Sequence, residues 1–167
     1  MTASEIIQRI ETQQNEEQRQ VLMRFFKTDK GDYGEGDESL GLKVPQTRAI
    51  VKVVAADTPL SEVPELLQSR WHEVRLCGLL ILVYKFEKAA TKRLINDPQA
   101  IQTRDEIVTL YLHYAEHANN WDLVDLSVHK ILGRWLMTPL LSPEGEDPMQ
   151  IEYKRQVLDE LAASPCL

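Results

Sequence analysis

The sequence has little of what marks a secreted or membrane-spanning protein. Its two cysteines, Cys77 and Cys166, are too few for a disulfide framework, and we interpret Cys77 as a small core residue. The longest apolar run, residues 76–84, is too short to span a bilayer and is flanked by Arg75 and Lys85. The first residues carry no apolar signal core. We therefore expect a cytoplasmic protein in a reducing compartment, without membrane contact.

Strand patterns are also missing. Apolar residues recur with helical spacing, and Pro, Gly or Asn separates the segments. A chain of 167 residues fits one domain. We therefore predict a single all-α domain of about eight helices, covering residues 1–167. The predicted helices span residues 5–14, 16–26, 45–56, 62–69, 70–89, 99–118, 121–137 and 149–164, and residues 90–97 form a further short helix or turn.

These helix lengths suit antiparallel pairs that stack on one another, although an irregular bundle also fits. On the last predicted helix, Val157, Leu158 and Leu161 form an apolar group that needs a partner. We expect either a continuation of the domain beyond Leu167 or a second subunit to cover it.

The net charge of −7 argues at first against a nucleic-acid partner. The acids, however, are concentrated near the two ends, and residues 41–143 carry 12 bases and 11 acids. Residues 85–93 are locally basic, and Arg48 and Lys52 lie one helical turn apart. Because screening makes nearby charges count most, the acidic total leaves room for a local phosphate-binding surface. A solvated helix face is the alternative.

The predicted helix 121–137 contains two aspartates with different expected roles. Asp122 lies in the first turn, where a carboxylate meets free backbone N–H groups and the positive end of the helix dipole. At ~100° per residue, Asp125 falls inside an apolar stripe. That stripe comprises Trp121, Val124, Val128, Ile131, Leu132, Trp135 and Leu136.

A carboxylate within an apolar stripe needs a compensating partner. Three arrangements are open for Asp125: a bond to His129 one turn later, a bond to the end of a neighbouring helix, or a position at a cleft that Trp121 and Asp125 line together. The cleft would provide a flat aromatic surface and a negative charge able to stabilise a cation or to orient water.

Three stretches resemble the AlkD-like DNA alkylation repair family, in the family's order and spacing. They are FFKTDKGDYGEGDESLGLKVPQTRAIVK, WHEVRLCGLLIL and NNWDLVDLSVHKILG, and together they extend over roughly residues 20–140. The resemblance implies HEAT-like helix pairs wound into a curved solenoid whose concave face holds duplex DNA. It also implies a DNA glycosylase that excises cationic N3- and N7-alkylated purines without a metal or organic cofactor.

The resemblance matches the family's active-site tryptophan to Trp121 and its catalytic aspartate to Asp125. An alkylated base is already a cationic leaving group, so the carboxylate would stabilise the oxocarbenium sugar and orient water. We expect DNA-backbone contacts, with little sequence specificity, from Lys and Arg on the concave face. The candidates are Lys43, Arg48, Lys52, Lys85 and Lys88.

The sequence departs from the family at one place. Family members continue with a helical segment that carries a second active-site tryptophan and arginines, whereas this sequence stops at Leu167. Trp135 lies on the same predicted helix as Trp121 and is not a substitute. We therefore regard the chain as the N-terminal portion of a longer family fold and expect weak or absent glycosylase activity from residues 1–167 alone.

Two alternatives belong to other functional classes. A shortened homologue would act as a non-catalytic module that binds DNA or protein with its concave face. A zinc hydrolase would use His113, Glu116 and His117, which match the H-x-x-E-H pattern. Those three side chains fall on the polar side of the predicted helix, however, so we expect a solvated helix end there.

Overall fold

The structure of the chain is a computed structural model that describes residues 1–32, 34–138, 141–142 and 145–164. It contains eight α-helices in that part of the chain, which confirms the all-α prediction. A pair of two-residue antiparallel strands, β1 and β2, precedes the last helix. The α-helices are α1 (Ala3–Glu11), α2 (Glu16–Phe25), α3 (Val44–Val54), α4 (Val63–Leu67), α5 (His72–Ala89), α6 (Pro98–His113), α7 (Trp121–Met137) and α8 (Pro148–Ala162); η1 (Leu60–Glu62) and η2 (Ala115–His117) are 3-10 turns, β1 is Leu141–Ser142 and β2 is Gly145–Glu146.

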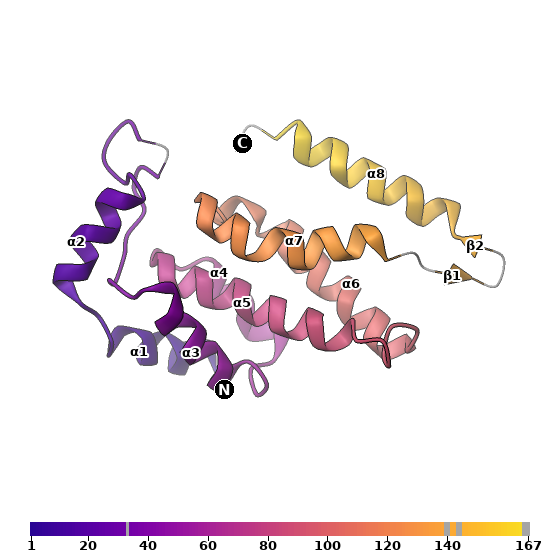
Figure 1. Cartoon of the computed structure of the whole chain (residues 1–167), viewed down its shortest axis with the longest axis horizontal. Coiled ribbons are helices and arrows are strands. Elements are labelled where there is room, and N and C mark those ends of the chain that lie inside the picture. Colours follow the sequence, from indigo (N-terminus) through magenta and orange to yellow (C-terminus); the bar gives the residue numbers. More distant parts are fainter. Residues whose placement is uncertain (33, 139–140, 143–144, 165–167) are drawn as a thin grey trace.

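Helices α3, α5 and α7 lie side by side in the nearer layer of Figure 1, and α4 and α6 lie behind them. Helix α1 packs against α3 and α4 at one end of this assembly. The two layers are consistent with stacked helix pairs, and the specific HEAT-like assignment remains a prediction. Within the described residues, no helix is long and apolar enough to cross a membrane.

Helix α5 is the centre of the core because α3, α4, α6 and α7 all contact it. Its residues are buried on every side from His72 to Val83, as expected for the apolar run that begins at Leu76 but not for His72, Glu73 and Arg75 before it. Gly78 allows the close approach of α4, since a Cβ atom there would lie 3.1 Å from the Leu66 Cβ. Arg104 of α6 closes the far end of α5 by donating hydrogen bonds to the carbonyls of Ala89 and Ile95.

The helix starts follow ordinary capping chemistry. Asn15 caps α2, as its sequence position predicts, by accepting a hydrogen bond from the Gln18 N–H. The first helix starts two residues before the predicted position, because Thr2 and Glu5 form a reciprocal capping box. Pro45 lies in the first turn of α3, where its missing N–H costs nothing.

Two helices are only loosely joined to this core. Helix α2 has no buried residue and stands at the edge of the molecule in Figure 1. Helix α8 follows the proline-rich break and contacts α7 through Tyr153, whose ring packs edge-on against Trp135 at 5.8 Å. Val157 is buried, but Leu158 is 48% exposed, so the predicted apolar group of α8 is only partly covered.

Candidate functional site

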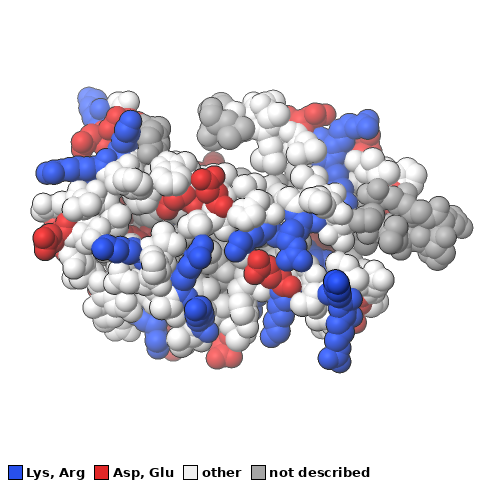
Figure 2. All heavy atoms as spheres, viewed as in Figure 1, with Lys and Arg blue, Asp and Glu red and all other residues white. Residues whose placement is uncertain are grey.

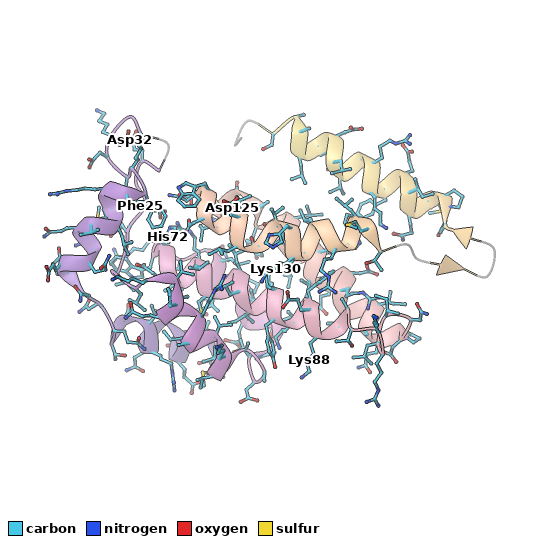
Figure 3. The ribbon with its side chains drawn as sticks, viewed as in Figure 1. Phe25, Asp32, His72, Lys88, Asp125 and Lys130 are labelled. Carbon is cyan, nitrogen blue, oxygen red and sulfur yellow. The ribbon has the colours of Figure 1, made fainter. Side chains whose placement is uncertain are left out.

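An exposed aromatic corner lies where α2 ends and α7 begins. Phe25 and Trp121 are 59% and 47% exposed, and their rings meet edge-on with centroids 5.8 Å apart. Phe26 lies beneath them, buried, with its centroid 6.0 Å from that of Trp121. We call Phe25, Phe26 and Trp121 the aromatic corner. Asp125 is exposed one turn after Trp121, and Figure 3 shows Phe25, His72 and Asp125 at this end of the molecule.

The structure corrects the expected burial of the two aspartates. Asp125 is exposed and does not lie in a buried stripe, whereas Asp122, expected at a solvated helix start, is 4% exposed. The buried face of the first turns of α7 runs through Leu123 and Ser127. Trp121 and Asp125 lie on a neighbouring face at the surface, where the Asp125 carboxylate is open to solvent.

The physical reason is the position of the neighbouring helices. Ser127 is buried against α6, where its hydroxyl bonds to the Tyr111 hydroxyl at 2.9 Å and donates to the Leu123 carbonyl. Satisfied in this way, a serine can occupy the buried face at little cost. The apolar pattern of α7 alone does not reveal such a partner, so the predicted stripe was rotated in the first half of the helix.

Asp122 belongs to a buried charged cluster centred on His72. The His72 ring places Nδ1 2.9 Å from Asp37 and Nε2 3.0 Å from Asp122, and one face of the ring stacks on Phe26 at 4.7 Å. Arg75 donates to the other oxygen of Asp37. We call Asp37, His72, Arg75 and Asp122 the His72 cluster.

Electrostatics in the His72 cluster favour the charged forms of His72 and Asp37. Burial alone disfavours the imidazolium, but hydrogen bonds to Asp122 and Asp37 outweigh it and raise the pKa of His72 to about 9. Burial likewise disfavours an ionised Asp37, yet His72 and Arg75 together lower the pKa of that carboxyl below its usual value. Two carboxylates, one imidazolium and one guanidinium balance one another in charge.

Arg75 also joins the two loops that flank the site. Its guanidinium donates to the carbonyls of Ser69 and Arg70 before α5, and to the His117 carbonyl and the Asn119 side chain before α7. These bonds satisfy backbone groups that no helix uses. The starts of α5 and α7 are therefore held together by one side chain.

Glu73 fixes the loop that leads from α2 to α3. The carboxylate is 1% exposed and accepts four hydrogen bonds, from the Ser39 hydroxyl and from the backbone N–H groups of Leu40, Gly41 and Leu42. Glu73 therefore binds mainly backbone, whereas Arg75, two residues later, makes the ion pair with Asp37.

Three buried polar atoms at the start of α7 have no hydrogen-bond partner among the residues that the structure describes: Nδ2 and Oδ1 of Asn120 and Oδ1 of Asp122. Asn120 is the N-cap residue of α7 but makes no capping bond with its side chain. Gly34 approaches it so closely that a Cβ atom there would lie 3.2 Å from Asn120 Nδ2. Asp122 and Asn119 make the described side-chain hydrogen bonds at the start of α7, to His72 and to Arg75.

The predicted DNA-binding lysines and arginines fall into two groups. Lys43, Arg48 and Lys52 are exposed on α3 or just before it. Figure 2 shows Lys and Arg side chains spread over the face formed by α3, α5 and α7, with fewer acidic groups among them. Lys88 lies well apart from Asp125 in Figure 3, at the lower edge of the same view.

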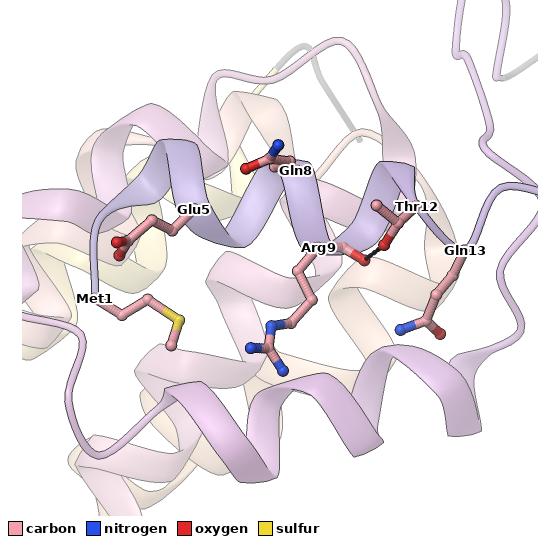
Figure 4. A pocket seen from close by; sticks show the side chains of 6 residues that line it. All are labelled: Met1, Glu5, Gln8, Arg9, Thr12 and Gln13. Carbon is pink, nitrogen blue, oxygen red and sulfur yellow. Dashed lines mark hydrogen bonds between the residues drawn. The ribbon is translucent and has the colours of Figure 1, made fainter.

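Lys85 and Lys88 border a hollow of about 440 Å³ between α5 and the start of α6. Burial and the neighbouring Lys88 lower the pKa of Lys85. A second hollow, shown in Figure 4, lies beside α1 and is also remote from the aromatic corner. Exposed or half-exposed side chains of one helix and its flanks line it: Met1, Glu5, Gln8, Arg9, Thr12 and Gln13.

The H-x-x-E-H match has no supporting geometry. His113 ends α6 and is exposed, and the nearest approach of the other two is 3.7 Å between His117 Nε2 and a Glu116 carboxylate oxygen. In the described part of the chain, no three His, Cys, Asp or Glu side chains come together as a metal ligand set. The zinc-hydrolase alternative is therefore not carried further.

Sequence reasoning selected Trp121 and Asp125 as candidates but did not select Phe25, the His72 cluster or Glu73. One signal could have identified them, because the three stretches that resemble the family contain Phe25, Asp37, His72, Arg75 and Asp122. The fold brings those stretches to one place, although 35 and 50 residues separate His72 from its two aspartates.

The chain was compared with known proteins. No curated protein and no solved structure matches the chain. A family described as DNA alkylation repair enzyme matches residues 6–164, which is nearly the whole sequence and includes every residue of the aromatic corner and the His72 cluster. The chain belongs to the DNA alkylation repair enzyme family.

Proposed function

We propose that the chain is a DNA glycosylase that excises cationic N3- and N7-alkylated purines from duplex DNA. The observation that carries the proposal is the pairing of exposed Trp121 and Asp125, one turn apart on α7 and beside Phe25. Family membership supports DNA alkylation repair in general, and this pair supplies chemistry suited to a breaking N-glycosyl bond.

The reaction needs little acid catalysis. Alkylation leaves a positive charge on the purine, so the base departs as a neutral molecule when it takes the electron pair of the C1′–N bond. The sugar then develops positive charge, which the Asp125 carboxylate stabilises. Water adds to C1′ and gives up a proton to the carboxylate or to solvent, leaving an abasic site.

The aromatic corner provides the other half of the site. An electron-rich indole face attracts a cationic base or the developing cationic sugar. Because Trp121 and Phe25 are both about half exposed, a lesion at the surface of the duplex can reach them without entering a deep pocket. This geometry differs from the usual glycosylase strategy, in which the base is flipped into an enclosed site.

Affinity for DNA comes from charge on the same face. Arg48 and Lys52 of α3 are exposed, whereas Lys130 of α7 pairs with Glu87 at 3.8 Å. Contacts of this kind neutralise phosphates and release counterions, so binding weakens steeply with salt and depends little on sequence. The locally basic face reconciles a DNA partner with a net charge of −7.

The test is excision of 7-methylguanine from a duplex under single-turnover conditions. Enzyme is kept in excess because we expect weak activity from residues 1–167 alone. We expect release above that of DNA alone, and a fall of about 100-fold or more in Asp125→Asn with duplex affinity unchanged. The control is Asp159→Asn, which changes an exposed carboxylate on α8.

Two outcomes count against the proposal. Equal release by wild type and Asp125→Asn would remove Asp125 from the chemistry. Duplex binding without any release above background would favour the non-catalytic module, which uses the same exposed face to hold DNA.

A further inference from the structure

His72 touches all three segments that build the candidate site. It bonds to Asp37 in the loop after α2 and to Asp122 in the first turn of α7, and it stacks on Phe26 at the end of α2. The charged groups that face it are these two carboxylates and Arg75, which is bonded to Asp37. Because both ring nitrogens face carboxylates, both must carry a proton to satisfy the pairs.

Two of the three contacts of His72, Asp122 and Phe26, lie one residue from an exposed aromatic residue of the site. Asp122 follows Trp121 and precedes Asp125 by less than one turn of α7. Phe26 follows Phe25, and the two rings pack edge-on at 5.2 Å. A displacement of His72 is therefore transmitted to both exposed aromatic rings and to the carboxylate.

The two walls are Phe25 at the end of α2 and Trp121 with Asp125 at the start of α7, and among the described contacts the His72 cluster links both of them to the core. Helix α2 buries no residue, so Phe26 is its main attachment to the core at that end. At the start of α7, the Asn120 side chain makes no hydrogen bond to a described residue, and the one described bond of the Asp122 carboxylate goes to His72. Asn119 contributes one further bond, to Arg75.

We propose that His72, as an imidazolium, is the positioning residue of the candidate site: it holds Asp122 and Phe26 so that Trp121, Asp125 and Phe25 keep one relative geometry. The structural part of this proposal is independent of the reaction, and only its effect on excision rests on the proposed function. When the ring loses a proton, one of the two carboxylates loses its hydrogen-bond donor. Phe25 on one side and Trp121 with Asp125 on the other then move independently of each other.

The first experiment is hydrogen exchange by mass spectrometry on His72→Gln and on the control His113→Gln, which changes an exposed histidine. We expect exchange to rise about tenfold or more in residues 21–27, 34–42 and 119–127 of His72→Gln, with residues 76–88 of α5 unchanged. Unchanged exchange in those three segments, or a uniform rise over the whole chain, would overturn the positioning role.

The pH profile of the wild type gives a second test that needs no altered fold. After correction for intrinsic exchange, the same three segments should loosen as the pH rises through about 9, where the ring deprotonates. Asp122→Asn removes one carboxylate while keeping an acceptor for Nε2–H, so its loosening should occur at least about one pH unit lower. Identical pH profiles would contradict the proposal, even if His72→Gln fails to fold.

Excision supplies the third readout. At pH 7, His72→Gln should lower the single-turnover rate by about 100-fold while changing duplex affinity by less than about threefold, because misplacement of about 1 Å weakens chemistry more than binding. A loss confined to DNA affinity would argue for a binding role instead. If the wild type does not excise, the proposed function fails and the exchange data still decide the role of His72.

Discussion

Replacing Glu73 with Gln tests how the loop after α2 is held. The substitution preserves shape but removes the charge and one acceptor oxygen. In the wild type, Oε1 accepts from the Ser39 hydroxyl and from the N–H groups of Gly41 and Leu42, and Oε2 accepts from Leu40 N–H at 2.8 Å. If the amide oxygen takes the position of Oε1, the amide nitrogen faces the Leu40 N–H, donor against donor.

The magnitude follows from the hydrogen bonds. A bond to a charged acceptor contributes about 1.5–3 kcal/mol and a neutral one about 1 kcal/mol, so three bonds weaken by about 1 kcal/mol each. The Leu40 N–H loses its partner at a further cost of about 1–3 kcal/mol, and relief from burying a charge offsets part of the sum. We expect a net loss of about 3 kcal/mol, which lowers the Tm by about 6–12 °C at this chain length.

The assay is thermal and urea unfolding followed by far-UV circular dichroism at pH 7. Glu65→Gln is the control, because it makes the same chemical change at an exposed position on α4. A Tm that falls by less than about 2 °C, as in the control, would refute the reasoning. The loop would then be held by the His72 cluster and not by Glu73.

Three further predictions concern the same region and the basic face. The raised pKa of His72 contributes folding stability that is complete below pH 6.5 and is lost as the pH rises to about 9. Between urea titrations at pH 6 and pH 9.5 we expect the free energy of unfolding to fall by at most about 3 kcal/mol in the wild type and to stay constant in His72→Gln. A wild-type free energy of unfolding that does not change with pH would contradict the assignment. Gly41 has a φ of 87°, and a Cβ atom there would lie 2.1 Å from the Asn15 carbonyl oxygen, so Gly41→Ala should destabilise the fold by more than about 2 kcal/mol. Gly36 has a φ of 82° but open space around it, so Gly36→Ala should cost only about 1 kcal/mol. Equal losses of stability for the two variants in chemical unfolding would contradict this prediction. Arg48→Ala and Lys52→Ala should each reduce the slope of log affinity for duplex DNA against log salt by about 0.9, while Arg155→Ala on α8 leaves the slope unchanged, as measured by fluorescence anisotropy.

The helices of this fold were predictable because their signals are local. Asn15 and Pro45 mark helix starts through chemistry that acts within one turn, and the all-apolar middle of α5 indicates burial on every side. The exposed pair of the candidate site was also local, since Trp121 and Asp125 lie one turn apart on α7. Their positions in the sequence were therefore enough to select them as candidates.

The buried half of the site was not predictable in the same way. Whether Asp122 or Asp125 is buried depends on His72, which is 50 residues away from Asp122 in the sequence. A wheel drawn for one helix contains no information about such a partner. The polar loop after α2 gave an equally incomplete picture, because Asp37 and Glu73 fix it through contacts formed only in the folded chain.

The first residues of α5 bind the loop that follows α2. These contacts restrict the length of the turn that precedes α5. His72 and Glu73 are adjacent yet serve different targets, and the His72 N–H also bonds to the Glu38 carbonyl at 2.8 Å. An inserted or deleted residue in the turn 68–71 would move His72 and Glu73 by one position along α5, a rotation of about 100°, so that neither side chain would face its partners. That surface turn should therefore vary in residue type but not in length, unlike an ordinary surface loop.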